Sequence, residues 1–396
     1  MSNKTNNNFN NSNSSTLKFY DGATQFRLRL IVSILSHRPL LLRNIHADTL
    51  ETAPGLLPHE ASFLRLLDSM TNGTTIEINS TGTQLRFLPG VLIGGKIDLH
   101  KCPTSKSIGW FLEGILPLAP FGKEPLEISF EGITDGTTHL DPSPDYIATA
   151  ILPLIKRFGI GIEEELDGSL NVPQCRVIRR GAAPLGQGLV RFYCPIVQEI
   201  QPFEFTTIGK FKRVRGNAIS CKIAPNSSAR VAFAAKGLLH KLLPDVWIHT
   251  DTHSMRHSKN VNGCGPSPGL GICLAAESTE GVIMCVECSL DPTKERGDEL
   301  PEDLGTRGSA LLLEEIRKGG CIDTSAQVLA FLFMCLGPED VSRIRVGSLS
   351  RNAIVALRLF KQVFGVEFKV KPDTQTKTIV MTCLGSGFRN MARAST

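Results

Sequence analysis

The chain has 396 residues, of which 41% are hydrophobic and 20% are charged, and its formal net charge is +5 at pH 7. This length allows roughly two domains or more around a sizeable core, and the composition is that of an ordinary soluble globular protein. The mild positive charge is compatible with RNA or with an acidic partner, but its density is too low to indicate either one.

The N-terminal stretch MSNKTNNNFNNSNSS has no apolar core of the kind that a secretory signal needs. We therefore expect residues 1–16 to form a disordered Asn/Ser tail. The longest apolar stretch, Val328–Leu336, is far shorter than the roughly 18 residues that cross a membrane. Eleven cysteines, an odd number scattered through apolar segments, are typical of a reducing intracellular compartment. These features predict a soluble cytosolic or nuclear protein without a membrane partner.

Three segments repeat one pattern, in which an amphipathic helix ends at a glycine and an alternating strand follows. Another helix and strand precede each segment, so two helices can pack on one face of a small sheet. The sequence therefore predicts an α/β fold (α+β layered), with three repeated two-helix/sheet units in one large domain. The segments begin at Phe63, Tyr146 and Ala353, and their stop glycines are Gly73, Gly159 and Gly365.

The third unit contains an insertion, because the first two stop glycines are 86 residues apart and the last two are 206 residues apart. The extra residues hold their own helix and strand within Ser227–Asp251, followed by the apolar strands GICLAAES and GVIMCVECSL. The charged stretch DPTKERGDELPEDLG reads as a return linker. We predict a large domain of residues 17–206 and 292–383, a small inserted α/β domain of residues 207–291, and a flexible C-terminal tail of residues 384–396.

The densest basic run, KFKRVRG, lies at the start of this insertion. Alternation along a strand would bring Lys210, Lys212 and Arg215 within reach of one surface, with Arg213 beside them. A solvated strand face, contacts with RNA phosphates or a partner, and a nuclear-import signal all remain open.

The insertion also contains residue types that bind zinc. Cys285 and Cys288, however, are three positions apart on an expected strand and so face opposite sides. We therefore predict a surface loop beside ordinary core cysteines, with no metal site. The stretch NGCGPSPGLG lacks the Lys-Ser/Thr end of a phosphate loop and is predicted to be a flexible turn. The candidate ligands are His249, His253, His257, Cys264, Cys273, Cys285 and Cys288.

The stretch RVGSLSRNAIVALRLFKQVFG reads as a strand end, a small-residue elbow and a helix. Ser348 in the elbow would lie near the positive end of the helix dipole, where a phosphate can bind. A serine before an apolar-periodic run is more often a helix cap, so Ser348 or Ser350 could simply accept a hydrogen bond from a backbone N–H.

Several stretches together resemble the RNA 3'-terminal phosphate cyclase family, from about Leu17 to Cys383. The resemblance implies three repeated α/β units with a smaller domain inserted in the third, as the glycine spacing also predicts. The matching stretches are HADTLETAPGLLPHE around Pro54–His59, RFLPGVLIGG at Arg86–Gly95, EGITDGTTHLDPSPDYI at Glu131–Ile147, IRRGAAPLGQGLV at Ile178–Val190 and GLGICLAAES at Gly269–Ser278.

Enzymes of this family use a histidine at the elbow before the last helix as their nucleophile. It attacks ATP, carries AMP as a phosphoramidate and passes it to an RNA 3'-phosphate, which closes to a 2',3'-cyclic phosphate. The resemblance sets the family's His-Leu-Leu-Thr-Asn stretch on SLSRN, so Ser348 occupies the histidine position. A serine hydroxyl needs an adjacent base, and its adenylyl ester would be too stable to pass AMP on. The resemblance therefore implies a chain that is inactive in cyclisation.

A second departure points the same way. Active members carry an Asp-Gly pair followed by Gly-Glu-Gly-Gly-Gly-Gln at the nucleotide site. Here Asp21 and Gly22 are followed by ATQFRLRL, which lacks those glycines although Arg29 still matches. Backbone that approaches a phosphate closely usually requires glycine. These departures and KGGCID at Lys318–Asp323 resemble the cyclase-like branch found in eukaryotic nucleoli.

That branch implies a ribosome-biogenesis factor of the small-subunit processome, needed for early cleavages of the ribosomal RNA precursor. The implied location is the nucleolus within the nucleus, and no cofactor is implied. The implied partners are a ribosome-assembly GTPase, pre-rRNA and small nucleolar ribonucleoprotein. A pre-rRNA endoribonuclease with a new active site is the alternative, and an active cyclase is the third hypothesis. RNA cleavage without metal needs a base and an acid, and no histidine pair in the sequence can be assigned to those functions.

Overall fold

The structure is a computed structural model, which describes residues 16–48, 54–135, 141–161, 171–224, 226–253, 263–290 and 299–390. The chain forms two compact units, residues 1–93 and residues 94–396. Within these described ranges, four four-stranded sheets and one two-stranded sheet accompany the helices, so the prediction of an α/β fold is confirmed. No helix within these described ranges has the length and apolarity needed to cross a bilayer.

The first unit contains one four-stranded sheet, whose first two strands are parallel and whose other pairs are antiparallel. Phe63 and Phe87 are completely buried in its core. In spatial order the strands are β1 (Leu17–Phe19), β2 (Leu40–Leu42), β5 (Leu85–Leu88) and β4 (Thr75–Ile78), with helices α1 (Phe26–Ser36) and α2 (Pro58–Met70) and a short pair β3 (Thr71–Asn72) and β6 (Val91–Leu92).

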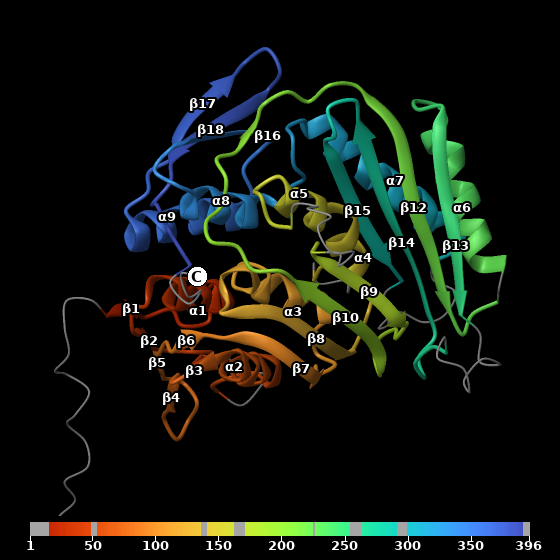
Figure 1. Cartoon of the computed structure of the whole chain (residues 1–396). Helices are drawn as coiled ribbons and strands as arrows, with labels where there is room; N and C mark the ends of the chain where they lie inside the picture. Colours follow the sequence, from red (N-terminus) through yellow and green to blue (C-terminus); the bar gives the residue numbers. More distant parts are fainter. Residues whose placement is uncertain are drawn as a thin grey trace, which may run out of the picture. The chain divides into compact units, whose positions relative to one another are not determined.

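Two further sheets, both in the second unit, repeat this parallel–antiparallel–antiparallel order (Figure 1). The predicted threefold repetition is therefore visible in the strand pairing. One sheet contains β7 (Gly94–Lys101), β8 (Glu124–Gly132), β10 (Gly188–Cys194) and β9 (Gln174–Arg179), with α3 (Ile108–Ile115), η1 (Ala119–Phe121) and the consecutive segments α4 (Pro144–Tyr146), η2 (Ile147–Ile151) and α5 (Leu152–Lys156). The other contains β11 (Glu204–Phe205), β16 (Val341–Val346), β18 (Thr378–Leu384) and β17 (Lys369–Asp373), with α8 (Gln327–Leu336) and α9 (Arg351–Phe364).

The three stop glycines all have positive φ angles, which a side chain rarely adopts. Gly365 ends α9 in the left-handed conformation, as the sequence predicts. Gly73 lies in the turn between β3 and β4, and Gly159 follows α5. The strand expected directly after Gly159 falls largely on residues 162–170, outside the described residues, and β9 begins at Gln174.

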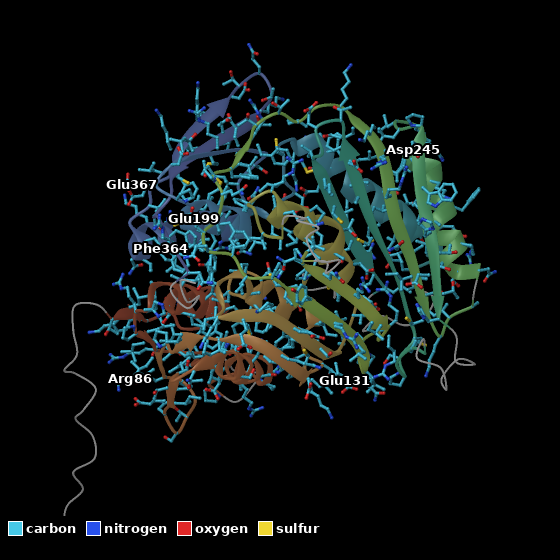
Figure 2. All side chains as sticks on the ribbon, viewed as in Figure 1. Arg86, Glu131, Glu199, Asp245, Phe364 and Glu367 are labelled. Atoms are coloured by element: carbon cyan, nitrogen blue, oxygen red, sulfur yellow. The ribbon has the colours of Figure 1, made fainter. Side chains whose placement is uncertain are left out.

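The insertion interrupts the third of the three repeated units, between β11 and α8, and forms a sheet of its own (Figure 1). Its two helices pack on each other and on the same face of that sheet. Figure 2 labels Asp245, the first residue of the edge strand β13. The elements are β13 (Asp245–His253), β12 (Phe211–Cys221), β14 (Gly269–Ser278), β15 (Ile283–Ser289), α6 (Asn226–Leu239) and α7 (Pro301–Lys318).

The prediction of a return linker was wrong for the last five residues of that stretch, which form the start of α7 at Pro301. Proline suits the first helical position, and Glu302 and Asp303 in the first turn complement the helix dipole. Residues 291–298 of that linker lie outside the described residues. Since α7 packs on α6, β14 and β15, we propose that the inserted unit extends to Lys318. The boundaries of the large domain stay a prediction.

Candidate functional site

The elbow before α9 lies where the sequence predicts it, between Val346 and Arg351. Ser350 caps the helix, since its hydroxyl accepts a hydrogen bond from the backbone N–H of Ala353 at 3.1 Å. Ser348 is exposed and is not needed for capping. The two serines of the elbow therefore have different functions, and the side chain of Ser348 is available to solvent.

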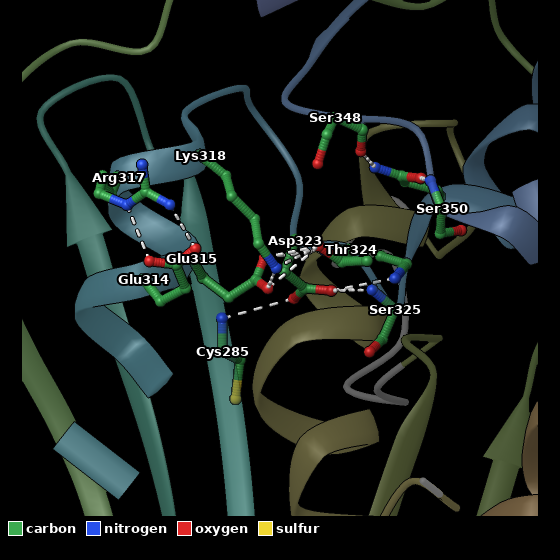
Figure 3. Close-up of polar contacts among 12 residues, drawn as sticks. Cys285, Glu314, Glu315, Arg317, Lys318, Asp323, Thr324, Ser325, Ser348 and Ser350 are labelled. Carbon is green, nitrogen blue, oxygen red and sulfur yellow. Dashed lines mark hydrogen bonds and ion pairs between the residues drawn. The ribbon is translucent and has the colours of Figure 1, made fainter. Parts of the chain in front are cut away.

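A buried glutamine fixes the backbone of the elbow, whose residues Ser348 and Ser350 are labelled in Figure 3. The side-chain amide of Gln327, the first residue of α8, donates to the carbonyl oxygen of Ser348 at 2.9 Å. Its carbonyl oxygen accepts from the backbone N–H of Ser350, also at 2.9 Å. Gln327 is only 1% exposed, so the side chain that makes both bonds is itself held in the interior. The elbow therefore has a defined shape, but the side chain that binds it is an amide, which cannot take a proton from a hydroxyl.

Replacing Gln327 by alanine is expected to lower the free energy of unfolding by about 1–2 kcal/mol, because two hydrogen bonds from a buried side chain to the elbow backbone are lost. Urea denaturation followed by circular dichroism measures this change. Gln375→Ala, in an exposed turn, is the matched control and should leave stability unchanged. Equal stability of the two variants would show that the contacts of Gln327 do not hold the elbow.

The KGGCID stretch forms a second buried polar centre beside the elbow (Figure 3). The carboxylate of Asp323 accepts from the hydroxyl of Tyr146 at 2.7 Å and from the backbone N–H of Ala326 at 2.9 Å. It also accepts from the backbone N–H of Cys285 on β15 at 3.4 Å. Burial raises the pKa of Asp323 to about 6. Asp323 therefore connects three parts of the chain: α4 of the second repeated unit, strand β15 of the insertion, and the start of α8.

Arg29 and Gly22, which match the family near the N-terminus, have structural contacts within the first unit. Arg29 is buried, and its guanidinium donates to the backbone oxygen of Asp21 at 2.7 Å and to its carboxylate at 2.8 Å. Burial lowers the pKa of Arg29. A Cβ atom on Gly22 would lie 2.6 Å from the side chain of Ile45, so close packing requires glycine there. These contacts explain both residues without a nucleotide.

The basic run lies on β12, with Lys210 immediately before the strand. Lys212 and Arg213 both pair with Glu277, at 3.3 and 2.6 Å, because a bulge lies between Phe211 and Arg213. The guanidinium of Arg215 makes two hydrogen bonds to the carboxylate of Asp245, at 2.9 and 2.8 Å. Neighbouring carboxylates therefore offset part of this charge, and contact with RNA or a partner stays a prediction.

The candidate zinc ligands are spread over several environments. His249 and His253 lie on β13, whereas His257 lies outside the described residues. Cys285 is 3.6 Å from Cys273 between sulfur atoms, and Cys288 instead contacts the backbone oxygen of Leu304 on α7. In the part of the chain that the structure describes, no group of three or more His, Cys, Asp or Glu residues could hold a metal ion.

The glycine-rich stretch does not form the flexible turn that the sequence predicts. The backbone N–H of Gly265 donates to the carbonyl oxygen of Arg180 at 2.7 Å, and the hydroxyl of Ser267 accepts from the N–H of Leu185 at 3.0 Å. A Cβ atom on Gly265 would lie 1.9 Å from the carbonyl oxygen of Gly186. Glycine here permits close packing against the loop after β9, so the prediction of flexibility was wrong for the described residues.

This loop leads to a cluster that the sequence analysis missed, which we call the ionic junction: Asp145, Arg180 and Asp251. Arg180 is only 5% exposed, and its guanidinium binds both carboxylate oxygens of Asp145, one at 2.8 Å. Its Nε donates to the carboxylate of Asp251 on β13 at 3.1 Å. Burial alone would lower the pKa of Arg180, but the hydrogen bonds with Asp145 raise it. The junction joins the second repeated unit to the insertion.

Two partly buried acids lie in the same region. The backbone N–H of Ser143 donates to Oε1 of Glu287 at 2.7 Å, and Oε2 has no hydrogen-bond partner among the described residues. Burial raises the pKa of Glu287 to about 8 and that of Asp135 to about 6. The only signal for Glu287 in the sequence is a single acid within the apolar strand GVIMCVECSL.

The family model described as RNA 3'-terminal phosphate cyclase matches residues 18–370. A "Probable RNA 3'-terminal phosphate cyclase-like protein" of Dictyostelium discoideum is 44% identical, over 96% of this chain and the whole of that protein. The human "RNA 3'-terminal phosphate cyclase-like protein" is 42% identical over 94% and 97% of the two chains. The "rRNA processing protein rcl1" of Schizosaccharomyces pombe is 38% identical over 95% and 98%.

Proposed function

Since the chain belongs to the RNA 3'-terminal phosphate cyclase family, we propose that it has the family fold without adenylyl transfer and acts in the processing of ribosomal RNA precursors. The exposed hydroxyl of Ser348, on an elbow held by the amide of Gln327, is the observation that carries this proposal. A serine hydroxyl is a weak nucleophile unless an adjacent base activates it, and the amide of Gln327 is not such a base. The fission-yeast relative that is named an rRNA processing protein supports the assignment to rRNA.

The finer proposal follows the cyclase-like branch that the sequence resembles. The protein acts in the nucleolus, within the small-subunit processome, and is required for the early cleavages that release the small-subunit rRNA precursor. It binds a ribosome-assembly GTPase and needs no nucleotide cofactor. The former catalytic elbow then serves as a surface of defined shape rather than as a reaction centre.

We expect purified protein incubated with ATP labelled on its α-phosphate to acquire no protein-bound AMP. Ser348→His is expected to form no cyclic phosphate on an RNA 3'-phosphate, because the stretch after Gly22 still lacks the glycines of the nucleotide loop. Denaturing gels measure the first result, and chromatography of digested RNA ends measures the second. A family enzyme with the histidine is the positive control.

Adenylation of the wild-type chain would overturn the proposal of lost chemistry. Cyclic phosphate made by Ser348→His would contradict the claim that the missing glycines after Gly22 independently prevent cyclisation. Depletion in cells is expected to leave the small-subunit precursor uncleaved, and normal precursor processing would overturn the assignment to rRNA. A site-specific cut made by the purified protein in precursor RNA would instead favour the endoribonuclease.

A further inference from the structure

The inserted sheet has one face that α6 and α7 cover and another that is covered only in part. On the second face, Ile219 and Cys221 of β12 pack with Ala182 of the second repeated unit. Toward the other end of this face the side chains of β13 are exposed to solvent and those of β12 are partly exposed, around the position of Asp245 (Figure 2). We call this part the open shelf, and it consists of Arg213, Arg215, Asn217, Trp247 and His249.

An exposed tryptophan lies at the centre of the open shelf. Trp247 is 57% exposed, whereas the other tryptophan, Trp110, is 8% exposed. The indole N–H donates to Nδ1 of His249 at 3.4 Å, and the two rings meet edge-on with centroids 5.7 Å apart. These contacts orient the indole while much of its surface stays in contact with water. The indole therefore presents an oriented, solvent-exposed π-face, on which another flat ring can stack.

Two basic side chains lie beside this ring, and two more lie farther along β12. Arg215 is directly opposite Trp247 in the β12–β13 register, and its side chain is 40% exposed. Since β13 is the edge strand, Lys236 of α6 reaches the ring around that edge, and its Nζ is 5.9 Å from the ring centroid. Four basic side chains stand against two carboxylates, which leaves a local charge of about +2. They are Lys212, Arg213, Arg215 and Lys236, against Asp245 and Glu277.

We propose that the open shelf binds unpaired RNA, with a base stacked on Trp247 and the adjoining phosphates held by Arg215 and Lys236. This inference rests on the proposed function and names the class of RNA that the inserted unit takes. An aromatic ring on an exposed sheet, with cations beside it, matches single-stranded nucleic acid, whose bases present open π-faces and whose backbone is anionic. Base-paired RNA offers phosphates to the same cations but no free base to the indole, so the shelf prefers single strands.

The test uses the full chain and an unstructured RNA of about 12 nucleotides, a length within the usual site sizes of single-strand binders. Anisotropy of a fluorophore on the RNA measures the affinity of every variant, including those without Trp247, and the duplex of the same sequence is expected to bind more weakly. Trp247→Ala should weaken binding about tenfold or more, whereas Trp247→Phe, which keeps a stacking ring, should lose much less. Ile354→Ala is the control, since Ile354 is an exposed apolar residue on α9.

A pair of arginine variants tests the phosphate contact. Arg215→Gln removes one exposed arginine–carboxylate pair from the shelf, and Arg230→Gln removes a similar exposed pair, with Glu302, between α6 and α7. Only Arg215→Gln is expected to weaken binding and to reduce its dependence on salt. Circular dichroism establishes that every variant is folded before its affinity is compared.

Wild-type affinity in folded Trp247→Ala would overturn the proposal, and so would equal affinity for duplex and single strand. Either result would leave the shelf as a surface for protein. The assays for adenylation and precursor processing do not depend on this RNA. If the shelf variants bind RNA normally while depletion still blocks processing, the shelf fails and the proposed function stands.

Discussion

Replacing Arg180 by alanine is expected to lower the free energy of unfolding by about 3–5 kcal/mol. Arg180 is buried, and its guanidinium neutralises Asp145 through paired hydrogen bonds while also binding Asp251. Removing it leaves the carboxylate of Asp145 uncompensated in the interior, and the cost of that charge exceeds the value of the lost contacts. Urea denaturation followed by circular dichroism measures the change.

Arg230→Ala is the matched control for Arg180→Ala. Arg230 makes an equally complete pair with Glu302, with nitrogen–oxygen distances of 2.6 and 2.7 Å, but both side chains are exposed. Water already solvates both charges there, so the loss of stability should be much smaller. Equal effects of the two substitutions would show that the ionic junction contributes no more than a surface ion pair.

Local patterns in the sequence were sufficient for most of the fold. The apolar periodicity predicted α9, and the left-handed glycine Gly365 ends it as expected. The pattern failed at α7, because a proline within a charged stretch reads as a linker until the apolar residues beyond it are included. Pro301 occupies the first helical position, where its missing N–H has no cost, and Leu304 and Leu312 form the buried stripe.

The candidate site was less accessible to sequence reasoning, since its contacts join residues that are far apart in the chain. The strand–helix pattern located Ser348 in an elbow and the family resemblance gave that position its meaning, but Gln327, 21 residues earlier, looks like an ordinary polar residue at the start of a helix. Arg180 and Asp145 lie in two stretches that carry the resemblance, yet only the fold brings them together. Those stretches therefore have a structural function in this chain, the attachment of the insertion, which requires no catalysis.

Glu287, on β15 of the insertion, accepts a hydrogen bond from the backbone N–H of Ser143 in the second repeated unit. Replacing it by glutamine is expected to increase stability in a pH-dependent way. Glu287 has a folded-state pKa of about 8 against its ordinary value of 4.5, because burial disfavours its charged form. Between those values the folded state holds a proton that the unfolded state has released, so wild-type stability falls as the pH rises through this window. Glutamine cannot ionise and should be more stable than wild type by on the order of 2–4 kcal/mol at pH 9, with little or no gain near pH 5. Urea denaturation across this range measures the difference.

Glu367→Gln, on the surface beside Lys361, is the control and should show no such gain. A gain for Glu287→Gln that is the same at pH 5 and pH 9 would contradict the assigned ionisation of Glu287.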